Sequence, residues 1–215
     1  MKNVYVLALT GEAIRPFTIA GRRVEFVQLS GFYAAVERRA ERLLVSESSL
    51  RTQHDIVTRL SDRIDAVVPA RFGMLIEEGE FRDILAARRA VIQEALTLVR
   101  GRVQMTVRFR EATAPTVVRS RSRDSTVSGT AYLEARRSAQ TTMPPAAGIV
   151  TTAVADLVIT ERAESATARA PAALYHLIDR GTVRQYAEAI SRLQSVTVNV
   201  SGPWPPFAFA PDLWR

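Results

Sequence analysis

The stretch Val67–Ile76, VVPARFGMLI, lies between two long segments of helical periodicity. Its leading β-branched residues and Phe72 favour extended structure, so the run predicts a buried strand. Gly73 permits a positive φ or a close approach of two backbones that a side chain would prevent. Arg71 is the exception, because an unpaired buried guanidinium costs several kcal/mol. We expect Arg71 to form a structural ion pair, with three nearby carboxylates as candidates: Glu77, Glu78 and Glu80.

The composition is that of an ordinary folded protein. The chain has 215 residues, of which 47% are hydrophobic and 24% charged, enough for one or two domains, and we expect two modest ones. Cysteine is absent, which excludes disulfides, thiolate metal sites and cysteine nucleophiles. The formal net charge of +7 suits nucleic acid, an acidic protein or anionic lipid without choosing among them.

The sequence gives no sign of export or membrane insertion, so a cytoplasmic location is the default expectation. Glu12 and Arg15 stand where a secretory signal would carry its apolar core. Two uncharged runs, 138–155 and 193–211, are interrupted by threonines and prolines, and neither is expected to span a membrane.

The first half of the chain predicts strands followed by two helices around the central run. Apolar β-rich segments predict strands at 3–9, 23–29 and 32–37. Ser46 or Ser48 is expected to cap a helix whose apolar residues recur at helical spacing as far as Ile64. A second helix is expected over 80–100, with Arg88 on its apolar stripe as a snorkelling side chain.

From residue 102 the periodicity changes. Apolar and polar residues alternate over 103–109, which predicts a half-buried strand with Gln104, Thr106 and Arg108 on its wet face. Further elements are expected as a helix from Thr126 or Ser128, a helical segment over about 145–158, strands at 162–170 and 173–179, a helix with a capping box at Thr182, and a strand at 196–200. This β-α-β-β-α-β order predicts a ferredoxin-like domain, in which both helices cover one face of an antiparallel sheet.

The fold class predicted is therefore α+β with two domains. The first, 1–101, is a small mixed α+β domain, and the second, 102–215, is a modified ferredoxin-like domain with a proline- and aromatic-rich tail over 202–215. That tail is stiff and carries large apolar groups that are costly to leave in water, at Trp204, Phe207, Phe209 and Trp214. We expect it to dock on the first domain, with docking on a partner as the alternative.

No catalytic constellation is visible, and the chain is interpreted as a non-enzyme without metal or cofactor. The two histidines, His54 on a predicted helix and His176 on a predicted strand, are interpreted as packing or surface residues. The single lysine is Lys2 and no glycine-rich phosphate fingerprint follows a strand. An arginine-rich loop is interpreted as solvated, with an anion or partner contact as the alternative, at Arg119, Arg121 and Arg123.

RNA binding is the runner-up function, because ferredoxin-like sheets can stack bases on exposed aromatic side chains. The polar face predicted for the strand at 103–109 holds no aromatic residue. The basic charge favours this alternative and the missing stacking platform disfavours it.

Four segments together resemble the GvpL/GvpF family of gas vesicle proteins: VYVLAL near the start, VVPARFG, SGTAYLEARR and the closing GPWPPFAF. They extend over nearly the whole chain, and GPWPPFAF is the most specific. The resemblance implies a two-domain α+β protein with a modified ferredoxin-like second domain, without enzymatic activity or cofactor. It implies an accessory protein of gas vesicles that acts in shell assembly or as a minor shell component.

The same resemblance implies partners and a location. The partners are the very apolar main shell protein and other accessory proteins, with no nucleic acid and no lipid membrane, and the location is the gas vesicle, with a cytoplasmic stage before assembly. The TTMPP break after SGTAYLEARR departs from the family pattern, and the F and L types are not distinguished. Candidate contacts are a free sheet edge and ten residues: Arg71, Phe72, Gly73, Arg119, Arg121, Arg123, Trp204, Phe207, Phe209 and Trp214.

Overall fold

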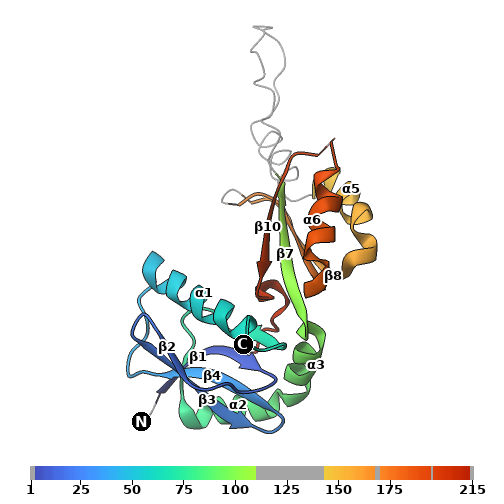
Figure 1. Ribbon diagram of the computed structural model, residues 1–215. Coiled ribbons are helices and arrows are strands. Elements are labelled where there is room, and N and C mark those ends of the chain that lie inside the picture. Colours follow the sequence, from blue (N-terminus) through green and yellow to red (C-terminus); the bar gives the residue numbers. More distant parts are fainter. Residues whose placement is uncertain (1–2, 110–142, 168–169, 195, 214–215) are drawn as a thin grey trace, which may run out of the picture. The chain divides into compact units, whose positions relative to one another are not determined.

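The computed structural model describes residues 3–109, 143–167, 170–194 and 196–213 (Figure 1). Contacts divide the chain into two compact units. The first unit comprises Met1–Gln104 together with Pro203–Arg215, and the second comprises Met105–Gly202. The mixed α+β class expected from the sequence is confirmed, with one sheet in each region.

The first unit is built on a six-stranded sheet with β1 (Asn3–Thr10) in the interior. The order is β2-β3-β4-β1-β5, and β6 also pairs with β1. The remaining bounds are β2 (Phe17–Ile19), β3 (Arg22–Leu29), β4 (Phe32–Arg38), β5 (Val67–Pro69) and β6 (Leu75–Glu77). Every residue of β1 from Val4 to Thr10 is buried, so both faces of the sheet are covered at its centre.

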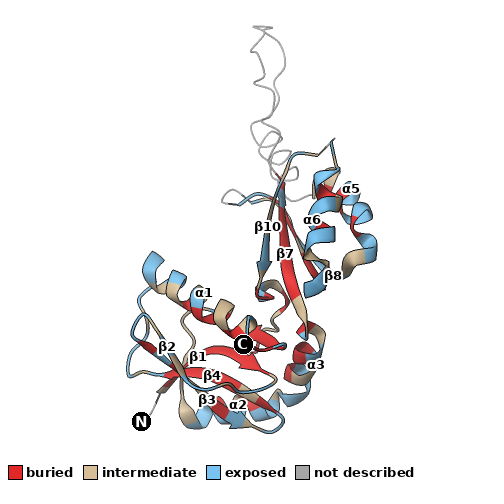
Figure 2. Ribbon diagram, in the orientation of Figure 1, coloured by how far each residue is buried: buried red, intermediate tan, exposed pale blue. Residues whose placement is uncertain are grey.

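Helices provide that cover. Figure 1 shows α1 (Glu47–Ser61) over one face of the sheet, and α2 (Glu78–Ala87) and α3 (Arg89–Val99) along the other. Ile56 and Leu60 of α1 pack in one cluster with Tyr5 of the central strand, and all three are fully buried. Figure 2 shows β1 coloured as buried. Ser46 is the N-cap, since its hydroxyl accepts a hydrogen bond from Ser49 N at 3.1 Å. Of the two capping serines considered, Ser46 is thus confirmed.

The prediction of one buried strand over Val67–Ile76 is wrong. Three residues form β5, the chain turns at Arg71–Gly73, and it resumes as β6. Both short strands pair antiparallel with β1, at its two ends. Gly73 has φ 88°, as the turn requires, and the permissive role expected of this glycine is confirmed. Arg71 lies in this turn and not in a buried strand, and its side chain is 67% exposed.

The single helix predicted over 80–100 is also divided. The helical backbone geometry breaks at Arg88, which has φ −102° and ψ 14°, although Arg88 N still donates to Ile84 O and Arg88 O still accepts from Ile92 N. Both helices keep the apolar stripe that the periodicity indicated, with Phe81 and Leu85 buried in α2 and Ile92 and Leu96 buried in α3. The periodicity therefore identified the buried face and missed the break.

The sheet of the second region has the order β10-β7-β9-β8. Its strands are β7 (Arg102–Phe109), β8 (Val158–Glu164), β9 (Ala173–Asp179) and β10 (Val198–Trp204), with helices α5 (Ala146–Ala153) and α6 (Val183–Ser191) and 3-10 turns at Ala155–Leu157, Arg180–Thr182 and Phe207–Phe209. Figure 1 shows α5 and α6 side by side. The helix expected from Thr126 or Ser128, SGTAYLEARR, lies outside the described residues.

Several details of this region differ from the sequence-based expectation. Gln104 and Thr106 are 5% and 2% exposed, so of the expected wet face only Arg108 is exposed. The strand predicted at 162–170 occupies 158–164, and the one predicted at 196–200 occupies 198–204. Thr182 makes no capping bond, since its hydroxyl instead donates to Asp179 O at 2.8 Å. In the described part of the chain, no helix combines the length and the apolar character needed to cross a bilayer.

Candidate functional site

A buried hydrogen-bonded chain holds the Arg71–Gly73 turn against the sheet. Gly73 N donates to the Tyr5 hydroxyl at 2.9 Å, and that hydroxyl donates to Gln53 Oε1 at 2.5 Å. The amide group of Gln53 donates in turn to Ala70 O at 3.3 Å. Burial raises the pKa of Tyr5 above its ordinary value of 10.0, so the phenol stays protonated and able to donate. The turn is therefore fixed by residues of β1 and α1.

An ion pair adjoins this chain. The Arg22 guanidinium lies over the Tyr5 ring, 5.3 Å from its centroid, and Arg22 Nε contacts Glu37 Oε2 at 2.7 Å. The other Glu37 oxygen pairs with Arg39 Nη1 at 2.9 Å. The Arg22 and Glu37 side chains are 9% and 10% exposed, so the pair is almost entirely desolvated. Sequence reasoning missed this pair, although the alternation of Arg22 with the buried Val24 in β3 was a usable signal.

The ion pair expected for Arg71 involves a different carboxylate. Arg71 Nη2 lies 3.6 Å from Asp212 Oδ2, and none of the three candidate glutamates is its partner in the contacts of the described residues. Glu78 instead pairs with Arg38 at 2.8 Å, and the Glu77 side chain caps α2. Since Arg71 is mostly exposed, this contact is worth little to stability.

The tail aromatics gather around His54 of α1. The His54 ring lies 5.4 Å from the Trp204 ring and 6.2 Å from the Phe207 ring, centroid to centroid. Phe209 is 3% exposed, whereas Phe207 is 38% exposed. Ala208 N donates to Gln104 Oε1 at 2.8 Å, which gives the buried Gln104 a partner. Four of the ten candidate residues, Arg119, Arg121, Arg123 and Trp214, lie outside the described residues.

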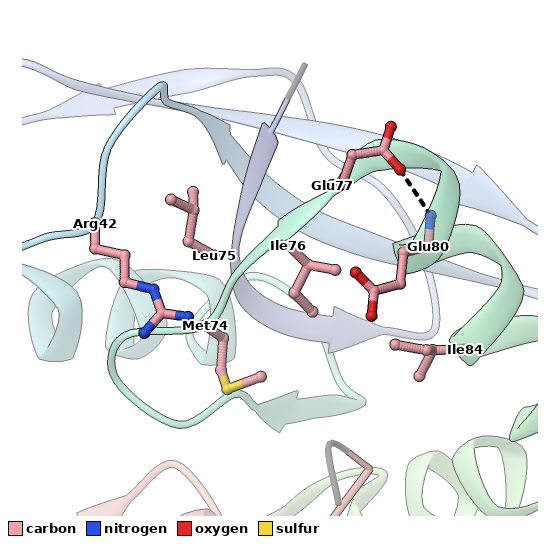
Figure 3. A pocket seen from close by; sticks show the side chains of 7 residues that line it. All are labelled: Arg42, Met74, Leu75, Ile76, Glu77, Glu80 and Ile84. Atoms are coloured by element: carbon pink, nitrogen blue, oxygen red, sulfur yellow. Dashed lines mark hydrogen bonds between the residues drawn. The ribbon is translucent and has the colours of Figure 1, made fainter. Parts of the chain in front are cut away.

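An open groove of about 290 Å³ runs along β6 in the first unit (Figure 3). Met74, Ile76 and Ile84 provide apolar walls, Arg42 stands at one end, and Glu77 and Glu80 stand at the other. Glu80 N donates to Glu77 Oε2 at 3.3 Å. Neither the Arg42 guanidinium nor the Glu80 carboxylate has an ion-pair partner among the contacts of the described residues. Sequence reasoning did not single out Arg42 or the groove.

The segment that carries Arg42 continues into exposed apolar residues. Leu44 is 86% exposed and Val45 is 78% exposed, the two largest values among the exposed large hydrophobic side chains of the described chain. Leu44 follows Arg42 by two residues, so its Cα lies within about 7 Å of the Arg42 Cα. Exposed apolar side chains next to a groove are typical of a protein contact.

The second unit holds a chain of hydrogen-bonded polar groups that runs from the surface into the core. Tyr186 Oη lies 2.6 Å from His176 Nδ1, His176 Nε2 lies 2.8 Å from Glu161 Oε2, and Thr151 Oγ1 donates to the same Glu161 oxygen at 2.7 Å. Burial lowers the pKa of His176 despite the opposing effect of Glu161, and burial raises the pKa of Tyr186. A neutral His176 that accepts from Tyr186 and donates to Glu161 satisfies both contacts.

This chain connects two strands and two helices, and it is open to solvent at Thr151 and Glu161 and closed to solvent at its inner end. Its members come from α5, β8, β9 and α6. His176 and Tyr186 are fully buried, so neither offers a surface at which a substrate could react. The interpretation of His176 as a packing residue missed its two hydrogen bonds.

Comparison with solved structures shows which fold this is. The chain is similar to the crystal structure of gas vesicle protein GvpF from Anabaena sp. PCC7120, with a TM-score of 0.74 and 13% identity over 98% of this chain and 97% of that one. It is similar to GvpF from Microcystis aeruginosa with the same TM-score and identity, over 97% of this chain and 99% of that one. At this level of identity the likeness establishes the fold.

The family is established by sequence. No curated protein matches the chain. Residues 3–211, nearly the whole chain, match the family model described as gas vesicle synthesis protein GvpL/GvpF. The resemblance noted from four segments is confirmed, and the chain belongs to the GvpL/GvpF family of gas vesicle proteins.

Proposed function

We propose that this chain acts in gas vesicle shell assembly, or as a minor shell component, by binding the apolar main shell protein. The match to the GvpL/GvpF family over residues 3–211 carries this proposal. A small, very apolar shell subunit tends to aggregate before it assembles, so a partner must cover its apolar surface or offer a strand edge. The exposed Leu44, Val45 and Phe207 are suited to such a contact.

Location, partners and chemistry follow from the same proposal. The protein is expected at the gas vesicle, in the cytoplasm before assembly, and in contact with other gas vesicle accessory proteins. It is expected to have no enzymatic activity and to need neither nucleic acid nor a lipid membrane.

The finer description of the fold is part of the proposal. We propose a first domain over 1–101 and a modified ferredoxin-like domain over 102–215, whose tail packs on the first. The strand order β10-β7-β9-β8 supports the ferredoxin-like assignment. The contacts of Trp204 and Phe207 with His54 support the packing of the tail.

Deletion of the gene in a vesicle-forming host, followed by electron microscopy, tests the biological role. Loss of vesicles, restored by the wild-type gene, supports it, and normal vesicles in the deletion strain contradict it. A second measurement tests the molecular act: the tagged chain is co-expressed with the main shell protein and recovered on affinity resin. If the shell protein is not recovered and the chain instead gives a salt-dependent gel shift with random RNA, the result favours the RNA-binding alternative.

A further inference from the structure

The groove along β6 offers a strand edge as well as side chains. Val6 N donates to Met74 O at 2.8 Å, and Val4 pairs with Ile76 in the same register. Because hydrogen-bonded positions alternate along an antiparallel pair, Leu75 and Glu77 direct their main-chain groups away from β1. The Leu75 amide bonds to Gly73 O, which leaves the Leu75 carbonyl and the Glu77 amide facing outward. An added strand would find one acceptor and one donor there.

The charges of the groove give it a direction. Arg42 lies at the Met74 end, while Glu77 and Glu80 lie at the other end, with Ile76 between (Figure 3). A segment bound in this groove meets the Arg42 guanidinium at one end and the Glu80 carboxylate at the other. Complementary charges on the segment therefore fix its orientation, and apolar side chains between them match the walls of the groove.

We infer that this groove, together with the adjoining Leu44 and Val45, receives the main shell protein. The bound segment is an extended, mainly apolar stretch that carries an acidic residue facing Arg42 and a basic residue facing Glu80. This inference rests on the proposed function and names the surface and the kind of segment involved.

Direct binding tests this assignment. Overlapping fluorescent peptides that span the main shell protein are titrated with the full-length wild-type chain, and the tightest-binding peptide is expected to contain an apolar run between an acidic and a basic residue. Arg42→Glu is expected to raise the Kd of that peptide about tenfold or more, because it replaces an attraction with a repulsion. Glu80→Lys is expected to do the same.

Two control variants carry the same charge changes at other positions of the same unit. Arg63→Glu and Glu94→Lys alter exposed residues outside the groove, and both are expected to leave the Kd within about twofold of wild type. Far-ultraviolet circular dichroism and melting temperature check that all four variants fold. A peptide with its acidic and basic residues exchanged is expected to bind the Arg42→Glu, Glu80→Lys double variant more tightly than it binds wild type.

The outcomes separate the two proposals. If the shell protein and its peptides do not bind the wild type, the proposed function fails and the groove assignment fails with it. If wild type binds and the groove variants bind as well as the matched variants, the shell contact lies elsewhere and only the groove assignment is overturned. If wild type self-associates in analytical ultracentrifugation and Arg42→Glu abolishes that association, the occupant is a second copy of this chain, which also overturns the assignment.

Discussion

The amide of Gly73 donates a hydrogen bond to the hydroxyl of Tyr5 at 2.9 Å, so a side chain from the central strand holds the turn between two short strands. The same hydroxyl donates to Gln53 Oε1, which connects the turn to α1. One phenol thus serves as acceptor for the loop and as donor for the helix. This arrangement explains how the chain can leave the sheet after Pro69 and return at Leu75 without losing its position.

Removal of that hydroxyl is predicted to destabilise the first unit. Tyr5→Phe keeps the ring and leaves the Gly73 amide and the Gln53 side chain without this partner, at a cost of about 1–3 kcal/mol in the free energy of unfolding. Tyr33→Phe is the matched control, because the Tyr33 hydroxyl makes no hydrogen bond with the residues that the structure describes, and its cost is expected within about 0.5 kcal/mol of zero. Urea denaturation measures both, and equal values for the two variants would contradict the role of Tyr5.

Two glycine-to-alanine substitutions are predicted to have opposite signs. Gly73 has φ 88° and an added Cβ would meet nothing within 4 Å. Gly73→Ala is therefore expected to lower the free energy of unfolding by about 1–2 kcal/mol through backbone strain alone. Gly148 lies in α5 with equally open space around it and no positive φ. Gly148→Ala is therefore expected to stabilise by about 0.5–1 kcal/mol. Thermal unfolding of both variants checks the signs, and stabilisation by Gly73→Ala would contradict the analysis of the turn.

Local pattern predicted the elements better than their boundaries. The apolar run of β1 and the stripe of α3 are visible in sequence because burial on a sheet or helix imposes a period. The turn inside VVPARFGMLI was not visible, since it depends on Tyr5 and Gln53, which are distant in sequence. The sequence placed Arg71 in a buried strand and did not single out Arg22. In the structure Arg22 is the buried arginine, and its ion pair with Glu37 offsets the free-energy cost of burying the guanidinium charge.

The groove was beyond sequence reasoning for a related physical reason. Arg42 comes from a loop, Ile76 from a strand and Glu80 from a helix, and only the folded chain brings them together. The family, in contrast, was accessible from short segments such as GPWPPFAF, since unusual proline and aromatic spacing is rare by chance.

The tail aromatics are predicted to differ in their contribution to stability. Phe209 is 3% exposed and Phe207 is 38% exposed, so Phe209→Ala is expected to cost about 3–5 kcal/mol and Phe207→Ala only about 1 kcal/mol. Chemical denaturation of each variant measures the difference. A larger loss for Phe207→Ala would mean that the exposures assigned to the two rings are reversed in solution.

The buried His176 predicts a loss of stability in mild acid. Burial lowers the pKa of His176 from its ordinary value of 6.5, so the unfolded chain binds a proton at a pH where the folded chain does not. The stability from the neutral imidazole is fully present above about pH 6.5 and is lost as pH falls below that value, with a slope of at most about 1.4 kcal/mol per pH unit. Tyr186, whose pKa is raised, acts in the opposite sense, because its contribution is lost only as pH rises above 10.0.

His176→Gln isolates this contribution from that of the carboxylates. Glutamine can bond to Glu161 and Tyr186 but does not titrate, so the variant is expected to be less stable at neutral pH and to have a shallower dependence of unfolding free energy on pH between about 5 and 7. Urea denaturation at a series of pH values gives both curves. If the two curves run parallel across this range, protonation of His176 does not differ between the folded and unfolded states, and the hydrogen-bonded chain through Tyr186 and Glu161 does not hold a neutral imidazole.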